Sequence, residues 1–274
     1  AASDVYKRQL QTRQNIVVVG AGYIGLEVAA IAAKQNKSVT VIEMADRVMN
    51  RTVDPQISDY YLNLHQKNGV TFKFNTSLKE IIGTNNPEKV VCSDGSEVAA
   101  DMVVIGAGIM PNVELAENAG LSCDNGIVVN EFGKTDHADI YACGDCTNHP
   151  NKLLNKKIRL ESVHNAMEQS KTVASSIINQ SIAYNQIPWF WSDQYDHKLQ
   201  IVGLSGDHDK VIMRGDMSEA KFMLFYTKED KLIAVDAVNN SKEFLICKKL
   251  VANKVTIKPD EISNPAKNLN DLIE

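Results

Sequence analysis

A buried-strand pattern, a glycine-rich turn and a helical pattern follow one another directly between Ile16 and Asn36. The apolar, β-branched run Ile16–Val19 is typical of a central parallel strand that is buried on both faces. Ser38–Glu43 has the pattern of a second strand. This order predicts a βαβ unit in a doubly wound α/β sheet of Rossmann type. The turn and the start of the helix consist of Gly20, Ala21, Gly22, Tyr23, Ile24 and Gly25.

The glycines of this turn have the G-x-G-x-x-G spacing that binds the pyrophosphate of a dinucleotide. Gly20 permits the tight turn, Gly22 lets the backbone approach the pyrophosphate, and Gly25 lets the helix pack closely on the strand. The helix N-terminus adds free N–H groups and the positive end of a dipole. The turn is therefore the first candidate binding site.

The acid at the end of the second strand indicates which dinucleotide is bound. Glu43 is placed to accept hydrogen bonds from ribose hydroxyls, and its charge would repel a 2′-phosphate. We therefore expect NADH rather than NADPH. Arg47 and Arg51 stand nearby in the sequence, and because an arginine can accommodate that phosphate, they leave NADPH open.

Composition excludes several classes of protein. The 274 residues, 44% hydrophobic and 23% charged, suffice for about two domains with their own cores. A net charge of −5 argues against nucleic acid as a partner. The sequence contains no uninterrupted apolar run of about 18 residues, the length that a membrane-spanning helix needs. Five cysteines in a chain of this size favour reduced thiols and a cytoplasmic protein.

Turn signals divide the rest of the first domain. Asp54-Pro55 predicts the start of a helix that runs to about Lys67. Asp101–Gly106 predicts a further buried strand. Between them, a small antiparallel meander inserted into the sheet is expected from strand patterns at Val70–Phe74, Val90–Cys92 and Val98–Ala99.

The remaining chain has a mixed pattern. A helix from Asn112 to about Ala119 is followed by predicted strands at Gly126–Val129 and Asp139–Ala142 and by a long helix over about Ser162–Asn179. After Pro188 an α+β domain is expected, with the last ten residues as a loose tail. Its predicted elements are strands at Leu199–Val202, Val211–Arg214, Phe222–Tyr226 and Leu232–Val238, and a helix near Ser241–Ala252.

Five motifs occur in an order and spacing that resemble a known family. They are Gly20-Ala-Gly-Tyr-Ile-Gly-Leu-Glu27, Gly106-Ala-Gly-Ile-Met-Pro-Asn112, Ile140-Tyr-Ala-Cys-Gly-Asp145, Glu161-Ser-Val-His-Asn-Ala166 and Pro188-Trp-Phe-Trp-Ser-Asp-Gln194. From about Asn15 to near its C-terminus the chain resembles the FAD-dependent NADH:ferredoxin reductases of oxygenase systems, which include the putidaredoxin, rubredoxin and aromatic-ring dioxygenase reductases. The Trp-Ser-Asp-Gln segment is the most diagnostic, and apoptosis-inducing factor has a related version of it.

The resemblance implies a flavoprotein oxidoreductase. It would transfer a hydride from NADH to FAD and pass electrons to an iron–sulfur ferredoxin or rubredoxin. It also implies three parts: an NAD(H)-binding domain over residues 10–112, the second half of a split FAD-binding domain over 113–183, and a C-terminal α+β reductase domain over 184–274.

Roles for individual residues follow from the same resemblance. Asp145 would hydrogen-bond the ribityl and phosphate side of FAD, and Val163 begins a helix whose N-terminus would point at the pyrimidine edge of the flavin. Trp191 would lie beside the isoalloxazine ring, whereas Trp189 is interpreted as packing.

On the nicotinamide side, Glu27 resembles the family's glutamate near the nicotinamide and the flavin ring. Gly106 and Gly108 resemble the glycines beside the bound nucleotide. Glu27 and Trp191 are thus the residues expected nearest the reacting rings.

The sequence carries a single G-x-G-x-x-G fingerprint, so the first FAD-binding segment of the family is expected to be missing. Ser3–Gln9 looks like translated adapter sequence, and residues 1–9 are therefore interpreted as an artefact. The chain as given is expected to bind NADH, to retain FAD weakly or not at all, and to be inactive by itself.

Other functions stay open at this stage. Cys143 and Cys146 form a C-x-x-C pair, which we interpret as accidental, and no cysteine or histidine spacing predicts a metal site. The alternatives are an NADH-linked reductase of a small molecule, such as monodehydroascorbate reductase or NADH oxidase, and a redox signalling protein like apoptosis-inducing factor.

Overall fold

The computed structural model describes residues 8–273, which form two compact units. The first unit extends to Gly108 and also contains residues 192–199; the second contains Ile109–Trp191 and the chain from Gln200 onward. Residues 1–7, most of the segment interpreted as an artefact, lie outside the described residues. The finer division into three parts stays a prediction.

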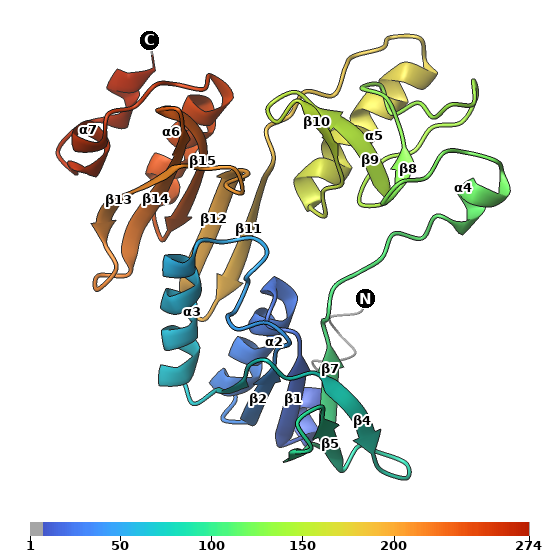
Figure 1. Cartoon of the computed structure of the whole chain (residues 1–274), viewed down its shortest axis with the longest axis vertical. Helices are drawn as coiled ribbons and strands as arrows, with labels where there is room; N and C mark the ends of the chain where they lie inside the picture. Colours follow the sequence, from blue (N-terminus) through green and yellow to red (C-terminus); the bar gives the residue numbers. More distant parts are fainter. Residues whose placement is uncertain (1–7, 274) are drawn as a thin grey trace. The chain divides into compact units, whose positions relative to one another are not determined.

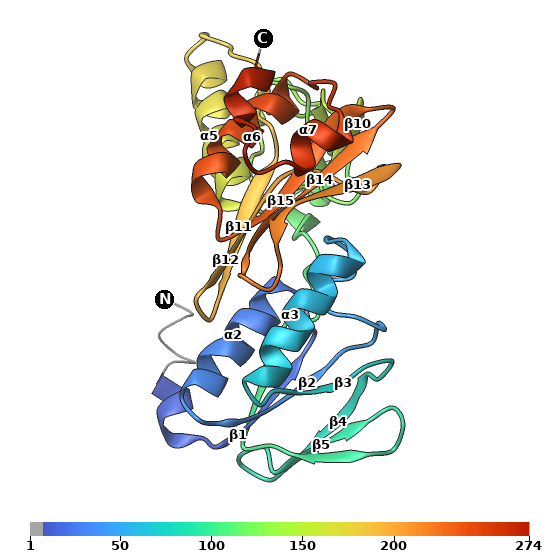
Figure 2. The same cartoon turned by 90° about the vertical axis from the view of Figure 1, so that its left-hand side faces the viewer.

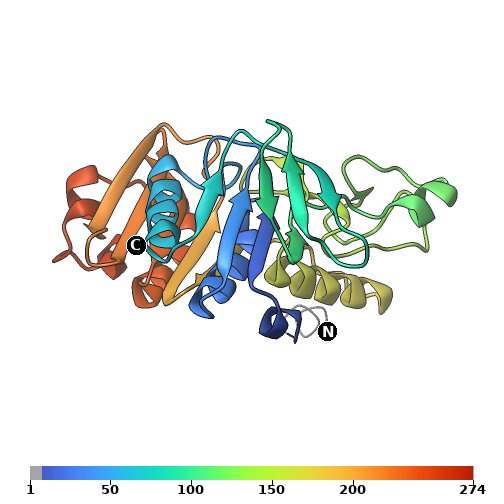
Figure 3. The same ribbon diagram turned by 90° about the horizontal axis from the view of Figure 1, so that it is seen from below.

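The first unit is built on a parallel sheet with the strand order β3-β2-β1-β7 (Figures 1 and 3). Ile16, Val17 and Val18 of the central strand are at most 1% exposed, as expected for a strand covered on both faces. Helix α2 packs on β1 and β2 (Figure 2), which confirms the βαβ unit. The elements are β1 (Asn15–Val19), α2 (Tyr23–Lys34), β2 (Ser38–Ile42), α3 (Pro55–Lys67), β3 (Thr71–Lys73) and β7 (Met102–Ile105).

A separate antiparallel sheet has the strand order β4-β5-β6, which confirms the inserted meander. Its strands are β4 (Leu78–Ile82), β5 (Lys89–Cys92) and β6 (Glu97–Ala99). The assignment of Val70–Phe74 to this meander was wrong, because Thr71–Lys73 instead pairs in parallel with β2. The expected set also lacked β4, whose residues are largely exposed and show no clean alternation.

The second unit begins with short elements around a three-stranded sheet, β10-β9-β8. The predicted strand Asp139–Ala142 is wrong: this segment makes one isolated bridge, between Lys134 and Tyr141. The carbonyl of Ile140 accepts hydrogen bonds from both the N–H and the hydroxyl of Thr135, and such local bonds replace a ladder. The elements are α4 (Glu114–Asn118), β8 (Ile127–Val128), β9 (Thr147–Asn151), β10 (Lys156–Ile158) and α5 (Val163–Ile177).

The C-terminal α+β part has a five-stranded sheet in the order β11-β12-β15-β14-β13. Helix α6 packs on β15, and Phe244, Cys247 and Leu250 from this helix are buried in the core. Its elements are β11 (Trp189–Gln194), β12 (His197–Gly203), β13 (Lys210–Asp216), β14 (Lys221–Lys228), β15 (Lys231–Val238), α6 (Ser241–Ala252), α7 (Pro259–Ser263) and a 3₁₀ helix, η1 (Leu269–Leu272).

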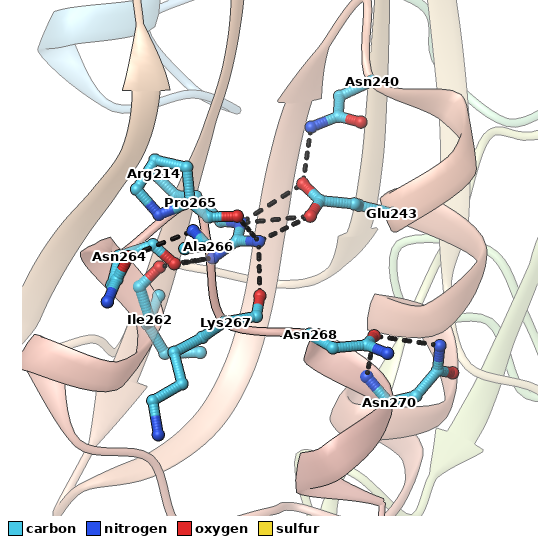
Figure 4. A network of polar contacts seen from close by, with 10 residues as sticks. All are labelled: Arg214, Asn240, Glu243, Ile262, Asn264, Pro265, Ala266, Lys267, Asn268 and Asn270. Atoms are coloured by element: carbon cyan, nitrogen blue, oxygen red, sulfur yellow. Dashed lines mark hydrogen bonds and ion pairs between the residues drawn. The ribbon is translucent and has the colours of Figure 1, made fainter.

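The end of the chain is held by a buried arginine, so the expected loose tail was wrong. Arg214 is 3% exposed on its side chain and pairs with Glu243 at 2.6 Å (Figure 4). A guanidinium group has five N–H donors, and burial makes unused donors costly. The other hydrogen bonds of Arg214 go to the carbonyls of Ile262, Asn264, Pro265 and Lys267. Leu269, just beyond Lys267, is 1% exposed and lies in the core.

Among the described residues, no helix combines the length and the apolar character needed to span a bilayer.

Candidate functional site

Two glycines of the turn after β1 are required by the protein's own backbone. Gly20 has a φ of +100°, and a Cβ there would lie 2.5 Å from the carbonyl oxygen of Gly106. A Cβ on Gly25 would lie 2.0 Å from the carbonyl oxygen of Gly20. The turn is thus closed tightly between the ends of β1 and β7, as the sequence motif requires.

Gly22 faces open space instead. A Cβ on Gly22 meets no protein atom within 4 Å, and its φ of −78° suits any residue. Gly22 is the N-cap of α2, makes no side-chain cap, and is followed by no acid in the first turn of the helix. The first N–H groups of α2 are therefore available to an anion, and the open space above Gly22 fits a pyrophosphate.

Glu43 lies directly beside this turn, at the end of β2. Its Oε2 accepts a hydrogen bond from the N–H of Ala21 at 2.7 Å, and its Oε1 accepts one from Ala45 at 2.8 Å. These contacts fix the carboxyl group where the resemblance expects the ribose. Because each carboxyl oxygen has a second lone pair, both can still accept a bond from a ribose hydroxyl.

Arg47 and Arg51, the two arginines that could accommodate the 2′-phosphate of NADPH, make different contacts. Arg47 donates to the carbonyls of Val53 and Asn50, at 3.0 and 2.8 Å, so its guanidinium group serves the loop after β2. Arg51 is exposed, and its Nη2 would lie 3.4 Å from a Cβ placed on Gly108. Of the two, Arg51 is the one placed beside the strand ends.

Gly106 and Gly108 follow β7 and lie at the same end of the parallel sheet as the glycine turn. The N–H of Gly106 donates to Val19 at 2.7 Å, which joins the end of β7 to the end of β1. Gly108 has a φ of +98°. The structure therefore brings Gly20, Gly22, Gly25, Glu43, Gly106 and Gly108 together at one end of the parallel sheet. Of the other residues named for this turn, Ala21 is buried, Tyr23 is half-buried and Ile24 is 67% exposed.

Glu27, on α2, contacts the tip of the β11–β12 hairpin. Its Oε1 accepts a hydrogen bond from the Ser192 hydroxyl at 2.7 Å and one from the N–H of Asp193 at 3.3 Å. These residues all belong to the first unit. The sequence motifs predicted a role for Glu27. They predicted none for Ser192 or Asp193, although both lie in the diagnostic Trp-Ser-Asp-Gln segment.

In the second unit, Asp145 lies near the N-terminus of α5. Its pKa is raised from the ordinary range by partial burial and by repulsion from Glu161, while the N–H of Ser162 and the charge of Arg159 oppose the shift. Ser162 caps α5, and the next residue, Val163, is 59% exposed. The structure thus brings Asp145 and Val163 to the same place, beside a helix end without an acid in its first turn.

The turn that carries Asp145 is anchored by the buried face of α5. Gln169 Oε1 accepts hydrogen bonds from the N–H of Gly144 and the hydroxyl of Thr147, at 2.7 and 2.8 Å. Gln169 is one of four polar residues that α5 buries, with Asn165, Thr172 and Ser176. Gln169 therefore ties the turn that carries Asp145 to α5.

Trp191 and Trp189 stack at a centroid distance of 5.4 Å. Trp191 is 41% exposed, so its side chain is partly open to solvent. Trp189 instead packs against Phe244 and lies under Lys248 Nζ, 4.0 Å from its ring centroid. The burial around this cluster lowers the pKa of Lys248.

Cys143 and Cys146 are free, and the Cys146 thiol lies 3.6 Å from the carbonyl of Cys143. Burial, followed by the neighbouring Cys146, raises the pKa of Cys143. A reactive thiol needs a lowered pKa. This environment gives no activation of the C-x-x-C pair.

Comparison with known proteins identifies two families along the chain. Residues 2–170 match the pyridine nucleotide-disulphide oxidoreductase family, and residues 189–273 match the reductase C-terminal family. The chain belongs to the pyridine nucleotide-disulphide oxidoreductase family, and the resemblance to ferredoxin reductases is confirmed.

Several relatives match nearly the whole of this chain. The chain is 38% identical to putidaredoxin reductase of Pseudomonas putida over 99% of its own length and 65% of that protein's. It is 38% identical to rhodocoxin reductase of Rhodococcus erythropolis, over 91% and 59%. Among solved structures, the ferredoxin reductase for the CYP199A2 system from Rhodopseudomonas palustris superposes with a TM-score of 0.94 at 37% identity, covering 98% of this chain and 67% of that one. The chain thus spans about two thirds or less of the length of these relatives.

Proposed function

We propose that this chain is the nicotinamide-binding and C-terminal part of a flavoprotein reductase. It would take a hydride from NADH onto FAD and pass electrons to a ferredoxin or rubredoxin of an oxygenase system. The observation that carries the proposal is the open helix end behind Gly22 with Glu43 fixed beside it. The names of the relatives, putidaredoxin reductase and rhodocoxin reductase, support the iron–sulfur partner.

The first unit would bind the dinucleotide through its backbone. The N–H groups at the start of α2 would hold the pyrophosphate, and Glu43 would accept from the ribose hydroxyls. The engagement of Arg47 by two carbonyls supports a preference for NADH, because that guanidinium group is not available to a 2′-phosphate. The tight closure at Gly20 would keep this cradle rigid.

The second unit would contribute to the flavin site. Asp145 and the N-terminus of α5 at Val163 would face the cofactor, and the exposed ring of Trp191 would lie beside it. FAD, when bound, supplies the redox chemistry; the chain supplies position and charge. A helix N-terminus stabilises negative charge on a group placed at its end. The proposal includes a cytoplasmic location, which is supported by an odd number of cysteines spread over a large chain, a pattern that fits reduced thiols.

A matched pair of glycine variants tests the proposal. A Cβ on Gly22 or on Gly206 meets no protein atom within 4 Å, so alanine at either position should leave the fold intact. NADH fluorescence titration of the purified chain should show binding for wild type and for Gly206→Ala. In Gly22→Ala the affinity should fall at least about tenfold, because the methyl group occupies the space of the pyrophosphate. Equal NADH affinity in both variants would refute the site.

A further inference from the structure

The tip of the β11–β12 hairpin carries polar side chains that are fully buried. Ser192 and Gln194 are 0% exposed, and so is His65 on α3, which they approach. Buried polar groups cost free energy unless their hydrogen bonds are made. The partners of these three side chains therefore show what the hairpin tip is built to do.

The hydrogen bonds form one continuous chain with a fixed direction. A carboxyl oxygen of Glu27 accepts from Ser192, so the Ser192 oxygen is free to accept from Gln194 Nε2, 3.1 Å away. The amide oxygen Oε1 of Gln194 then requires a donor, which is His65 Nε2 at 2.9 Å.

The last link fixes the tautomer of the histidine. Since His65 carries its proton on Nε2, its Nδ1 accepts from the Tyr195 hydroxyl at 3.2 Å. Burial lowers the pKa of His65 to about 4, so the ring is neutral, as this arrangement requires. We call Ser192, Gln194, His65 and Tyr195 the hairpin clasp.

The clasp ends on one oxygen of Glu27 and leaves the other available. Oε1 receives two donors, whereas Oε2 takes part in none of the hydrogen bonds found among residues 8–273. Glu27 lies five residues after Gly22 on α2, about 7 Å along the helix from the open N-terminus. The carboxyl group therefore has one anchored oxygen and one oxygen for a ligand.

The clasp also reaches the glycine turn by a second route. Gln194 Nε2 lies 3.9 Å from Met49 Sδ, and the N–H of Met49 donates to the carbonyl of Ala21 at 2.9 Å. A segment far along the sequence thus supports both α2 and the loop beside the dinucleotide cradle.

We propose that Ser192, Gln194 and His65 are positioning residues that hold Glu27 Oε1, so that Oε2 is presented to the nicotinamide end of a bound dinucleotide. The proposal rests on the proposed function, which supplies the dinucleotide. It assigns the Ser-Asp-Gln part of the motif to nicotinamide binding. A purely structural clasp would stabilise the unit without distinguishing one end of the ligand from the other.

Two ligands separate these roles. NADH and ADP-ribose share the adenosine and the pyrophosphate, but only NADH carries nicotinamide. In Ser192→Ala, which cuts the link between Gln194 and Glu27, the dissociation constant of NADH should rise about three- to tenfold, the effect of one lost hydrogen bond. That of ADP-ribose should stay unchanged. Ser38→Ala, at an exposed serine of the same unit, is the control.

Each result decides the matter. Loss of NADH affinity alone supports the proposal; equal loss for both ligands, or no loss for either, overturns it. If wild type binds neither ligand, the proposed function fails, and the clasp is then decided by ¹⁵N NMR of labelled histidine in the wild-type chain. A neutral His65 ring protonated on Nε2 supports the clasp, and a proton on Nδ1 overturns it. The same spectrum serves if Ser192→Ala does not fold.

Discussion

Replacing His65 by glutamine should make the stability of the chain less dependent on pH. In the folded chain the pKa of His65 is about 4, because burial outweighs the hydrogen bond to Gln194. In the unfolded chain it returns to its ordinary value near 6.5. Between these values the unfolded histidine is protonated and the folded one is neutral, so unfolding takes up a proton and becomes easier as the pH falls.

The size of this effect follows from the two pKa values. With about 1.4 kcal/mol for each tenfold change in proton affinity, the wild-type chain should lose about 3 kcal/mol of unfolding free energy at His65 as the pH falls from 6.5 to 4. Below 4 the loss stops, because both states are then protonated. Glutamine can still donate to Gln194 and accept from Tyr195, but it does not titrate.

Urea unfolding followed by far-ultraviolet circular dichroism measures the difference. Between pH 6.5 and pH 4 the unfolding free energy of wild type should fall by about 3 kcal/mol more than that of His65→Gln. Carboxyl groups that titrate in this range contribute equally to both proteins and cancel. His137→Gln, at an exposed ring, should follow wild type. Parallel curves for wild type and His65→Gln would show that the buried ring is not held neutral and would refute the reasoning.

Two further variants and one spectrum of the unchanged chain have separate outcomes. In Glu43→Ala the N–H groups of Ala21 and Ala45 lose their acceptor, so the affinity for NADH should fall about tenfold and the preference for NADH over NADPH should shrink. Calorimetric titration with both nucleotides measures these affinities. An unchanged preference would exclude Glu43 as the group that selects NADH. Arg214→Met removes the charge partner of Glu243, which keeps the donor Asn240, and the donor of four carbonyls. The change should cost about 3–5 kcal/mol in urea unfolding, whereas a loss under about 1 kcal/mol would mean that water replaces the guanidinium group. If the single glycine fingerprint binds the nicotinamide nucleotide, as proposed, none is left for FAD, so the purified chain should show no stoichiometric flavin absorption; a full yellow band contradicts this.

The parts that could be predicted from the sequence are those governed by short-range rules. In the glycine turn, the φ of +100° favours glycine at Gly20, and the carbonyl of Gly20 leaves no room for a Cβ on Gly25, five residues later. Asp54-Pro55 starts α3 where its pattern indicates, with Asp54 capping the N–H of Gln56. The misassigned strand at Asp139–Ala142 shows the limit of such rules. Its pattern suits a strand, but Thr135 takes the carbonyl that a neighbouring strand would need.

Long-range polar contacts could not be predicted in the same way. The C-terminal segment has an unremarkable composition, and its order depends on Arg214, about 50 residues earlier. The hairpin clasp is a stronger case. Trp-Ser-Asp-Gln stands out in the sequence as a motif, yet the partners of Ser192 and Gln194 lie 165 and 129 residues away, at Glu27 and His65. No periodicity links residues at such separations.

The clasp explains why the aromatic and the polar residues of the Trp-Ser-Asp-Gln motif have different surroundings. Trp191 belongs to the second unit and is partly exposed, whereas the next residue, Ser192, belongs to the first unit and is fully buried. One strand, β11, therefore carries the ring expected beside the flavin and, directly after it, the donor that holds Glu27. If the proposed function holds, a change at Ser192 alters the nicotinamide side through Glu27, and a change at Trp191 alters the flavin side. A Trp191→Ala variant should accordingly leave NADH and ADP-ribose affinities of the chain unchanged, in contrast to Ser192→Ala, and a selective loss of NADH affinity in Trp191→Ala would contradict this division of roles.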